Sequence, residues 1–169
     1  MKKVKHKCFI SFHRRDKDEV DEFCQKFSGS FIRRGLLMED DIVDSKNTDY
    51  VMRRIREQYL KDSTVTIVLV GKCTWARRFV DWEVQASLRN PSASYPNGLV
   101  AIQLRNSYKK LPSRVKLNID SSYAKFYEYP TTNQSLSNII DEAYYSRYNY
   151  QELIVNPRER NLYNRTCEY

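Results

Sequence analysis

The sequence predicts an α/β domain built on a doubly wound, parallel five-stranded sheet. Short apolar or β-branched segments alternate along the chain with segments whose apolar residues recur at helical spacing. The segment 64–70 is almost continuously apolar or β-branched, which is typical of a strand buried on both faces of a parallel sheet. Alternation of this kind favours right-handed crossovers, and we expect the strand order 2-1-3-4-5.

The first strand is expected at 8–12, a short apolar run. Asp16 and Glu19 have the spacing of a capping box and mark the start of a helix. Its apolar residues recur at helical spacing as far as Phe31, and Gly35 is placed to end it.

The next elements follow in the same alternating order. A weak second strand is expected around 36–38, before the acidic residues 39–41. A second helix is expected to begin near Thr48, with an apolar face, and to lead into the strand at 64–70. The remaining elements are a helix at about 76–89, strands at 99–104 and 125–129, and a last helix that includes residues 136–144.

Length and composition limit the class of protein. The 169 residues carry 29 Lys and Arg against 21 Asp and Glu, a formal net charge of +8. We expect one domain, residues 1–146, followed by a Tyr- and Arg-rich extension, residues 147–169. The extension is expected either to mediate self-association or to pack on the domain, against the last helix. No stretch approaches the ~18 apolar residues of a membrane span, and the basic N-terminus does not resemble a signal peptide.

The four cysteines are not arranged in CxxC pairs. Cys8 and Cys24 fall within apolar patterns, which predicts small buried thiols rather than a disulfide framework or a zinc site. A reducing cytoplasm is therefore the expected compartment. We expect no bound metal and no cofactor.

The basic composition, with a pI near 9.3, suggests polyanion binding. The positive charges are nevertheless spread along the chain without a nucleic-acid motif, so we expect a solvated basic surface and no specific nucleic-acid binding. The four glycines form neither a P-loop nor a GxGxxG motif. His6 and His13 belong to no motif that would indicate a nucleophilic triad.

The predicted strand order places a candidate site between the first and third strands. Ligands of such sheets bind outside the carboxyl ends of the strands where the order reverses, here between the loops 12–16 and 71–75. On the helix that follows the second loop, Glu83 lies about 40° from Phe79, within the apolar arc. A carboxylate in that arc faces a cavity, is protonated or is paired with an Arg or Lys. Alternatively, the helix is rotated slightly from the assumed orientation, and Glu83 then does not face the interior.

Two segments resemble TIR domains. Residues 8–13 with Asp16 are similar to their first motif, and residues 63–83 are similar to the third strand and following helix of bacterial TIR-like proteins, including that of the Thoeris antiphage system. The resemblance implies a flavodoxin-like fold and cleavage of the nicotinamide–ribose bond of NAD, with Glu83 as the catalytic residue. Phe79 stands where many TIR domains carry Trp.

The resemblance implies a bacterial signalling enzyme that takes NAD as its substrate and needs no cofactor. Its product would be a cyclic ADP-ribose-type nucleotide that acts on a downstream effector, and the chain would self-associate. Phe12, His13, Trp75, Arg77 and Asn106 are the residues expected to line the NAD site, although core packing is an equal alternative for Phe12 and Trp75. The alternative function is a non-catalytic protein–protein interaction module.

Overall fold

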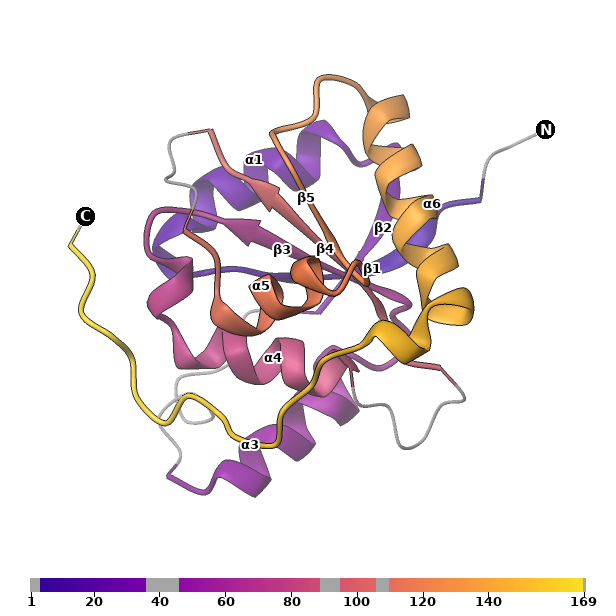
Figure 1. The fold of residues 1–169 in the computed structure, drawn as a ribbon. Coiled ribbons are helices and arrows are strands. Elements are labelled where there is room, and N and C mark those ends of the chain that lie inside the picture. The colour runs from indigo at the N-terminus through magenta and orange to yellow at the C-terminus, as the bar shows by residue number, and fades with distance from the viewer. Residues whose placement is uncertain (1–3, 36–45, 89–94, 106–109, 169) are drawn as a thin grey trace.

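The computed structural model describes residues 4–35, 46–88, 95–105 and 110–168 (Figure 1). Its centre is a five-stranded sheet in the order β2-β1-β3-β4-β5, and every pair of neighbouring strands is parallel. The expected strand order is therefore confirmed. The strands are β1 (His6–Ser11), β2 (Phe31–Arg34), β3 (Val65–Val70), β4 (Gly98–Gln103) and β5 (Lys125–Tyr127).

Helices cover both faces of the sheet. On one face, α1 (Lys17–Lys26) and α6 (Asn133–Asn149) pack against alternate residues of β1, β3 and β4. The opposite face is covered by α3 (Thr48–Arg54), α4 (Arg78–Leu88) and α5 (Ser113–Asp120) (Figure 1). Because β3 is covered on both sides, all its residues are buried, as its β-branched sequence predicts.

The first helix is shorter than its apolar spacing predicts, and the second strand comes earlier. The α1 helix ends at Lys26, and after a turn Phe31 begins β2, opposite His6 of β1. The intervening Ser-Gly-Ser sequence disfavours continued helix. Phe31 still packs against Phe23 of α1, with ring centroids 6.3 Å apart. The turn thus returns Phe31 to the side of the core that a continued helix would also have reached, which is why its spacing in the sequence looks helical. Residues 36–38, expected as the second strand, lie outside the described residues.

The predicted capping box is also wrong. The Asp16 side chain makes no capping hydrogen bond to α1, which follows a 3-10 turn, η1 (Arg14–Asp16). Glu19 instead accepts a hydrogen bond at 2.7 Å from the backbone N–H of Arg105, beyond β4. The Glu19 carboxylate, which the local sequence pattern assigns to a capping box, is therefore used in a tertiary contact with Arg105.

The second predicted helix is confirmed, but α5 was not predicted. The α3 helix begins at Thr48 and continues into a π-helical turn, η2 (Ile55–Tyr59). The buried residues of α5 are Arg114, Val115 and Asn118. Two of these three are polar, so α5 has no apolar periodicity that the sequence could reveal.

The chain beyond α6 returns to the other side of the molecule. After a 3-10 turn, η4 (Gln151–Leu153), the tail extends along α5 and α4 towards the end of β3 (Figure 1). It therefore packs on the helices opposite α6, not against the last helix. Within the described ranges, no helix has the length and apolar character needed to cross a membrane.

One disulfide contradicts the expectation from the cysteine pattern. Cys73, after β3, is joined to Cys167 of the tail, with their Cα atoms 5.8 Å apart. The two positions are 94 residues apart, so no local spacing signals the pairing. Cys8 and Cys24 are free, as expected, with Cys8 fully buried and Cys24 partly buried.

Candidate functional site

The loops that follow β1 and β3 meet at the carboxyl edge of the sheet. A Cβ atom placed on Gly71 would lie 2.6 Å from Cγ of Asp16, so only glycine allows this close approach. The Gly71 N–H donates to Oγ1 of the buried Thr74 at 2.8 Å, which closes the turn into a 3-10 segment, η3 (Thr74–Ala76). The two loops between which the strand order predicts a site are therefore in direct contact.

Glu83 lies on α4 and faces the end of β1. Its side chain is buried, with 8% exposed, and its Oε1 accepts a hydrogen bond from the hydroxyl of the fully buried Ser11 at 2.9 Å. Within the described ranges, no Lys or Arg forms an ion pair with Glu83. The carboxyl group is therefore hydrogen-bonded but not neutralised by a cation of the described part of the chain.

Burial changes the protonation of this carboxyl group. Desolvation raises the pKa of Glu83 from its ordinary 4.5 to about 8, and the Ser11 hydrogen bond partly opposes this shift. The free protein therefore holds Glu83 largely protonated at neutral pH. A positively charged ligand beside Glu83 would favour the ionised form, because opposite charges lower the pKa of a carboxyl group.

His13 and Arg77 lie at the same edge. Burial, followed by the charges of Arg77 and Arg15, lowers the pKa of His13 to about 4. The imidazole is therefore neutral at physiological pH, where it offers one hydrogen-bond donor and one acceptor. The structure thus brings together a neutral imidazole and cationic guanidinium groups on the two loops of the site.

The other expected site residues have different surroundings. Trp75, in η3, is partly buried, and Nζ of Lys110 lies 3.3 Å from its ring centroid in a cation–π contact. Phe12 packs against the core on the α1 and α6 side of the sheet, the face opposite Glu83. The structure does not bring Phe12 to the carboxyl group. Asn106 lies outside the described residues.

Ser11 is the site residue that sequence reasoning missed. It follows Phe9 by two positions in β1, so both side chains point to the α3 and α4 face. A buried hydroxyl within an apolar strand needs a hydrogen-bond partner, and this requirement is the signal that would have found it.

A separate cavity lies away from this edge. Its volume is about 440 Å³, and it is bounded by the first half of β4, by β5 and by α6. Its wall includes Tyr127, Tyr145 and Tyr150, with Lys125 and Glu142 forming an ion pair among the lining residues. Of the expected NAD-site residues that the structure describes, none lines this cavity.

Comparison with known families identifies the chain. The family described as Thoeris protein ThsB, TIR-like domain, matches residues 9–109, more than half of the 169-residue chain. The chain belongs to this family. It is accordingly a TIR-like protein of antiphage defence with a flavodoxin-like α/β fold. No curated protein matches the chain.

Removing the Ser11 hydroxyl is expected to perturb Glu83 selectively. Ser11→Ala leaves the buried carboxyl group without its donor, so we expect a loss of about 1–3 kcal/mol in the free energy of unfolding. The pKa of Glu83 should also rise further, because the Ser11 hydrogen bond lowers it. Carboxyl NMR titration and denaturant unfolding measure the two effects.

Ser87→Ala is the matched control for this substitution. Ser87 is as buried as a core residue, but its hydroxyl donates to the Val84 carbonyl of its own helix at 3.0 Å. We expect it to leave the Glu83 pKa unchanged. Equal Glu83 titration in the Ser11→Ala and wild-type proteins would contradict a functional hydrogen bond between Ser11 and Glu83.

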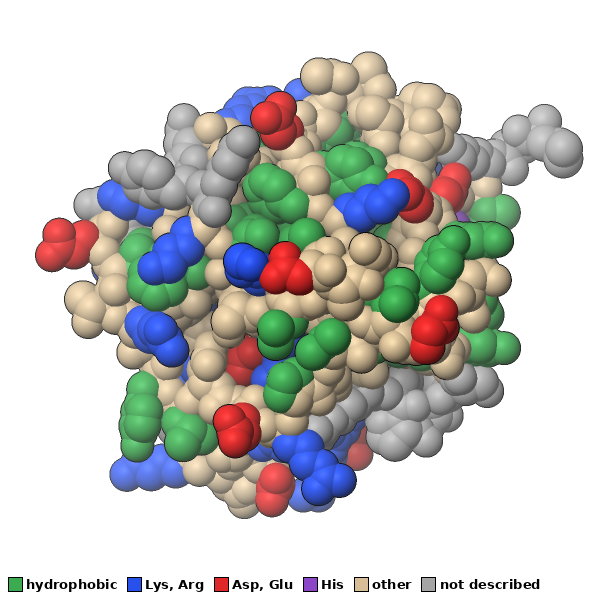
Figure 2. All heavy atoms as spheres, viewed as in Figure 1, with side chains coloured by type: hydrophobic (Ala, Val, Ile, Leu, Met, Phe, Trp, Pro, Cys, Tyr) green, Lys and Arg blue, Asp and Glu red, His purple; other side chains and the backbone are tan. Residues whose placement is uncertain are grey.

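Nucleic-acid binding is expected to be weak and electrostatic. Basic and acidic side chains are interspersed on the face shown in Figure 2, where they form no uniform basic surface. We expect binding to disappear by about 150 mM salt, because counterion release alone supports it where no nucleic-acid motif accompanies the charge. Fluorescence anisotropy with duplex DNA and single-stranded RNA measures this. Sub-micromolar affinity at that salt, with a sequence or structure preference, would contradict it.

Proposed function

We propose that this Thoeris TIR-like domain cleaves the nicotinamide–ribose bond of NAD, with Glu83 as the catalytic carboxylate. The observation that carries the proposal is a buried Glu, without a cationic partner among the described residues, at the strand-order reversal where α/β sheets bind ligands. Family membership supports it independently.

The chemistry requires stabilisation of a developing positive charge. Breaking an N-glycosidic bond passes through an oxocarbenium-like state, as in glycoside hydrolysis. The Glu83 carboxylate would stabilise that charge in a site of low dielectric constant. The cationic nicotinamide ribosyl group would itself favour the ionised form of Glu83, which is largely protonated in the free protein. Arg77 supplies a positive charge for the pyrophosphate.

The fate of the ribosyl group depends on which nucleophile reaches it. We propose that the bound NAD molecule places its own adenine against the ribosyl carbon, so that the product is a cyclic ADP-ribose-type nucleotide. We propose that this nucleotide is a signal to a downstream effector in antiphage defence.

The direct test is nicotinamide release from NAD by the purified protein. Wild-type protein should release nicotinamide and a cyclic nucleotide, whereas Glu83→Gln should release both at least about 10²-fold more slowly. Glu142→Gln is a matched control, because Glu142 lies on α6, pairs with Lys125 and is half-exposed. Equal nicotinamide release by the wild-type and Glu83→Gln proteins would contradict the proposed role of Glu83.

A second candidate function, a non-catalytic interaction module, is supported by how closed the site is. Glu83 is 8% exposed, and Lys110 covers a face of Trp75. Such a module would signal through self-association. Assembly without nicotinamide release, measured by light scattering in the presence of NAD, would favour this function over catalysis.

A further inference from the structure

The first part of the C-terminal tail, residues 156–161, is held by buried side chains of α4 and α5. Arg114, 4% exposed, donates to backbone oxygens of this segment at 2.7 and 2.8 Å. Asn161 donates its N–H to Asp81 at 2.9 Å, and its carbonyl oxygen accepts from Trp82 Nε1 at 2.8 Å. This segment is integrated into the fold.

The last part of the tail, residues 162–168, has a different character. It is largely exposed, and Tyr163 shows 78% of its surface to solvent. Arg78 donates to it from its backbone and its guanidinium group at 3.0 and 3.1 Å, and Arg165 donates its N–H to the Ala76 carbonyl oxygen at 2.9 Å. Each exposed hydrogen bond of this kind contributes little net stability. Ordering an extended segment costs conformational entropy, so these bonds alone hold residues 162–168 weakly.

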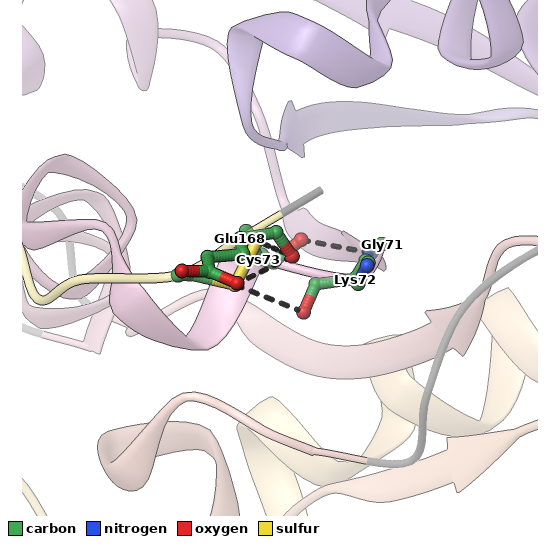
Figure 3. The surroundings of a disulfide bond; sticks show 6 residues. Gly71, Lys72, Cys73 and Glu168 are labelled. Carbon is green, nitrogen blue, oxygen red and sulfur yellow. Dashed lines mark hydrogen bonds between the residues drawn. A yellow bond between two sulfur atoms is a disulfide. The ribbon is translucent and has the colours of Figure 1, made fainter.

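The disulfide connects this weakly held segment to the candidate site. Figure 3 shows Cys73 and Glu168 beside the turn formed by Gly71 and Lys72. Sγ of Cys167 lies 3.8 Å from the Lys72 carbonyl oxygen, and Sγ of Cys73 lies 3.9 Å from that of Glu168. The covalent bond therefore fixes residues 162–168 to the loop that carries Trp75 and Arg77.

We propose that the Cys73–Cys167 disulfide is a redox latch that orders both the tail segment 162–168 and the site loop 71–77. With the bond formed, the segment lies along η3 and the start of α4. With the bond reduced, residues 162–168 detach, while residues 156–161 stay on α4 and α5. The loop then loses its covalent anchor next to Cys73.

The reducing partner is a dithiol. Its thiolate attacks Sγ of Cys167, which is partly exposed, whereas Cys73 is 2% exposed. The Cys73–Cys167 bond breaks, and Cys73 leaves as a thiolate that takes up a proton. The second thiol of the dithiol then attacks the mixed disulfide, which releases Cys167 as a thiol and the dithiol as a cyclic disulfide. Two electrons and two protons pass from the dithiol to the protein.

The latch bears on ligand binding, and this step rests on the proposed function. Trp75 and Arg77 lie two and four residues after Cys73. The disulfide fixes the position of Cys73 and therefore restricts the positions that both side chains can adopt. A preorganised site binds more tightly, because less entropy is lost on binding. The oxidised protein is therefore the form with higher affinity for NAD.

Hydrogen exchange tests the latch without reference to NAD. The full-length protein is compared with and without dithiothreitol, and alkylation with mass spectrometry establishes the linked pair. We expect a Cys73–Cys167 cross-link in the oxidised protein. Reduction should speed exchange in 162–168 and 71–77 and leave 156–161 protected. Absence of the cross-link, or unchanged exchange on reduction, would overturn the proposal.

Two variants separate the latch from general effects of thiols. Cys167→Ser should exchange like the reduced protein under both conditions, because the bond cannot form. Cys24→Ser is the matched control, since Cys24 is a free cysteine on α1 away from the tail, and it should respond to dithiothreitol as the wild type does. A Cys167→Ser protein whose exchange still changes on reduction would contradict the assignment.

The link to the site is tested by NAD affinity. Calorimetry on Glu83→Gln protein, which should consume NAD only slowly, is expected to show affinity at least about fivefold weaker after reduction. Equal affinity of the two redox forms would overturn the link between latch and site. Failure of NAD to bind either form would overturn the proposed function, whereas the exchange experiment would still decide the latch.

Discussion

Glu83→Gln is expected to lower nicotinamide release from NAD by about 10²–10³-fold, the usual effect of losing one electrostatic contact to a transition state. The amide keeps the shape of the side chain and still accepts the Ser11 hydrogen bond, but it carries no charge to stabilise the ribosyl cation. The measurement is the initial rate of nicotinamide release at saturating NAD. A variant that releases nicotinamide at the wild-type rate would eliminate Glu83 as the catalytic residue.

The same substitution should increase stability at high pH. The Glu83 carboxyl has an ordinary pKa of 4.5 but a pKa of about 8 when folded, so the folded state retains a proton that the unfolded state releases. The stability of the wild type therefore falls between pH 4.5 and 8, by up to about 1.4 kcal/mol per pH unit. Gln carries no titrating group, so the variant avoids this loss.

Denaturant unfolding at pH 5 and pH 8 measures the difference. We expect the two proteins to be similar in stability at pH 5 and the Gln variant to be more stable at pH 8. A variant that is less stable at both values would show that Glu83 neutralises a cation in the folded protein. Together, lost activity and retained stability separate a catalytic carboxylate from a structural one.

The sequence predicted the sheet because the strands carry strong local signals. The segment 64–70 is β-branched at every position except Leu69, and its residues 65–70 form the fully buried β3. The burial of Glu83 was expected for a related reason, since the apolar arc of a helix faces the interior and Glu83 lies within that arc. The close contact of Gly71 with Asp16 also follows from the predicted strand order.

The errors arise where tertiary contacts override local patterns. Phe31 continues the helical spacing of α1, yet it begins β2, because a turn brings it back to the same core. Asp81 and Gln85 lie on the polar arc of α4 and would be solvent-exposed on an isolated helix. They are buried because the tail covers them. No local sequence signal predicts that the tail covers Asp81 and Gln85. None predicts the disulfide between Cys73 and Cys167 near the end of the tail either.

Arg114→Met is expected to lower the free energy of unfolding by about 3–5 kcal/mol, because it leaves a buried charge without its partner. Arg114 and Asp81 are each 4% exposed by side chain and form an ion pair at 2.8 Å. The same guanidinium group donates to Asn156 at 2.9 Å and to two backbone oxygens of the tail. Chemical denaturation measures the loss.

Lys116→Met is the matched control, since Lys116 lies on the same helix, pairs with Asp120 and is 65% exposed. Exposed pairs contribute about 0–1 kcal/mol, so this variant should retain nearly the stability of the wild type. The double variant Asp81→Leu, Arg114→Met removes both charges and should recover part of the loss, because no charge then remains unpaired.

Arg114→Met should also change the hydrogen exchange of the tail, in addition to the stability of the fold. Residues 156–161 lose the donor that binds their backbone, so their hydrogen exchange should rise even with the Cys73–Cys167 bond intact. Reduction of the wild type should instead release residues 162–168 alone. If Arg114→Met were as stable and as protected as Lys116→Met, the Asp81–Arg114 pair would not be what attaches the tail to α4.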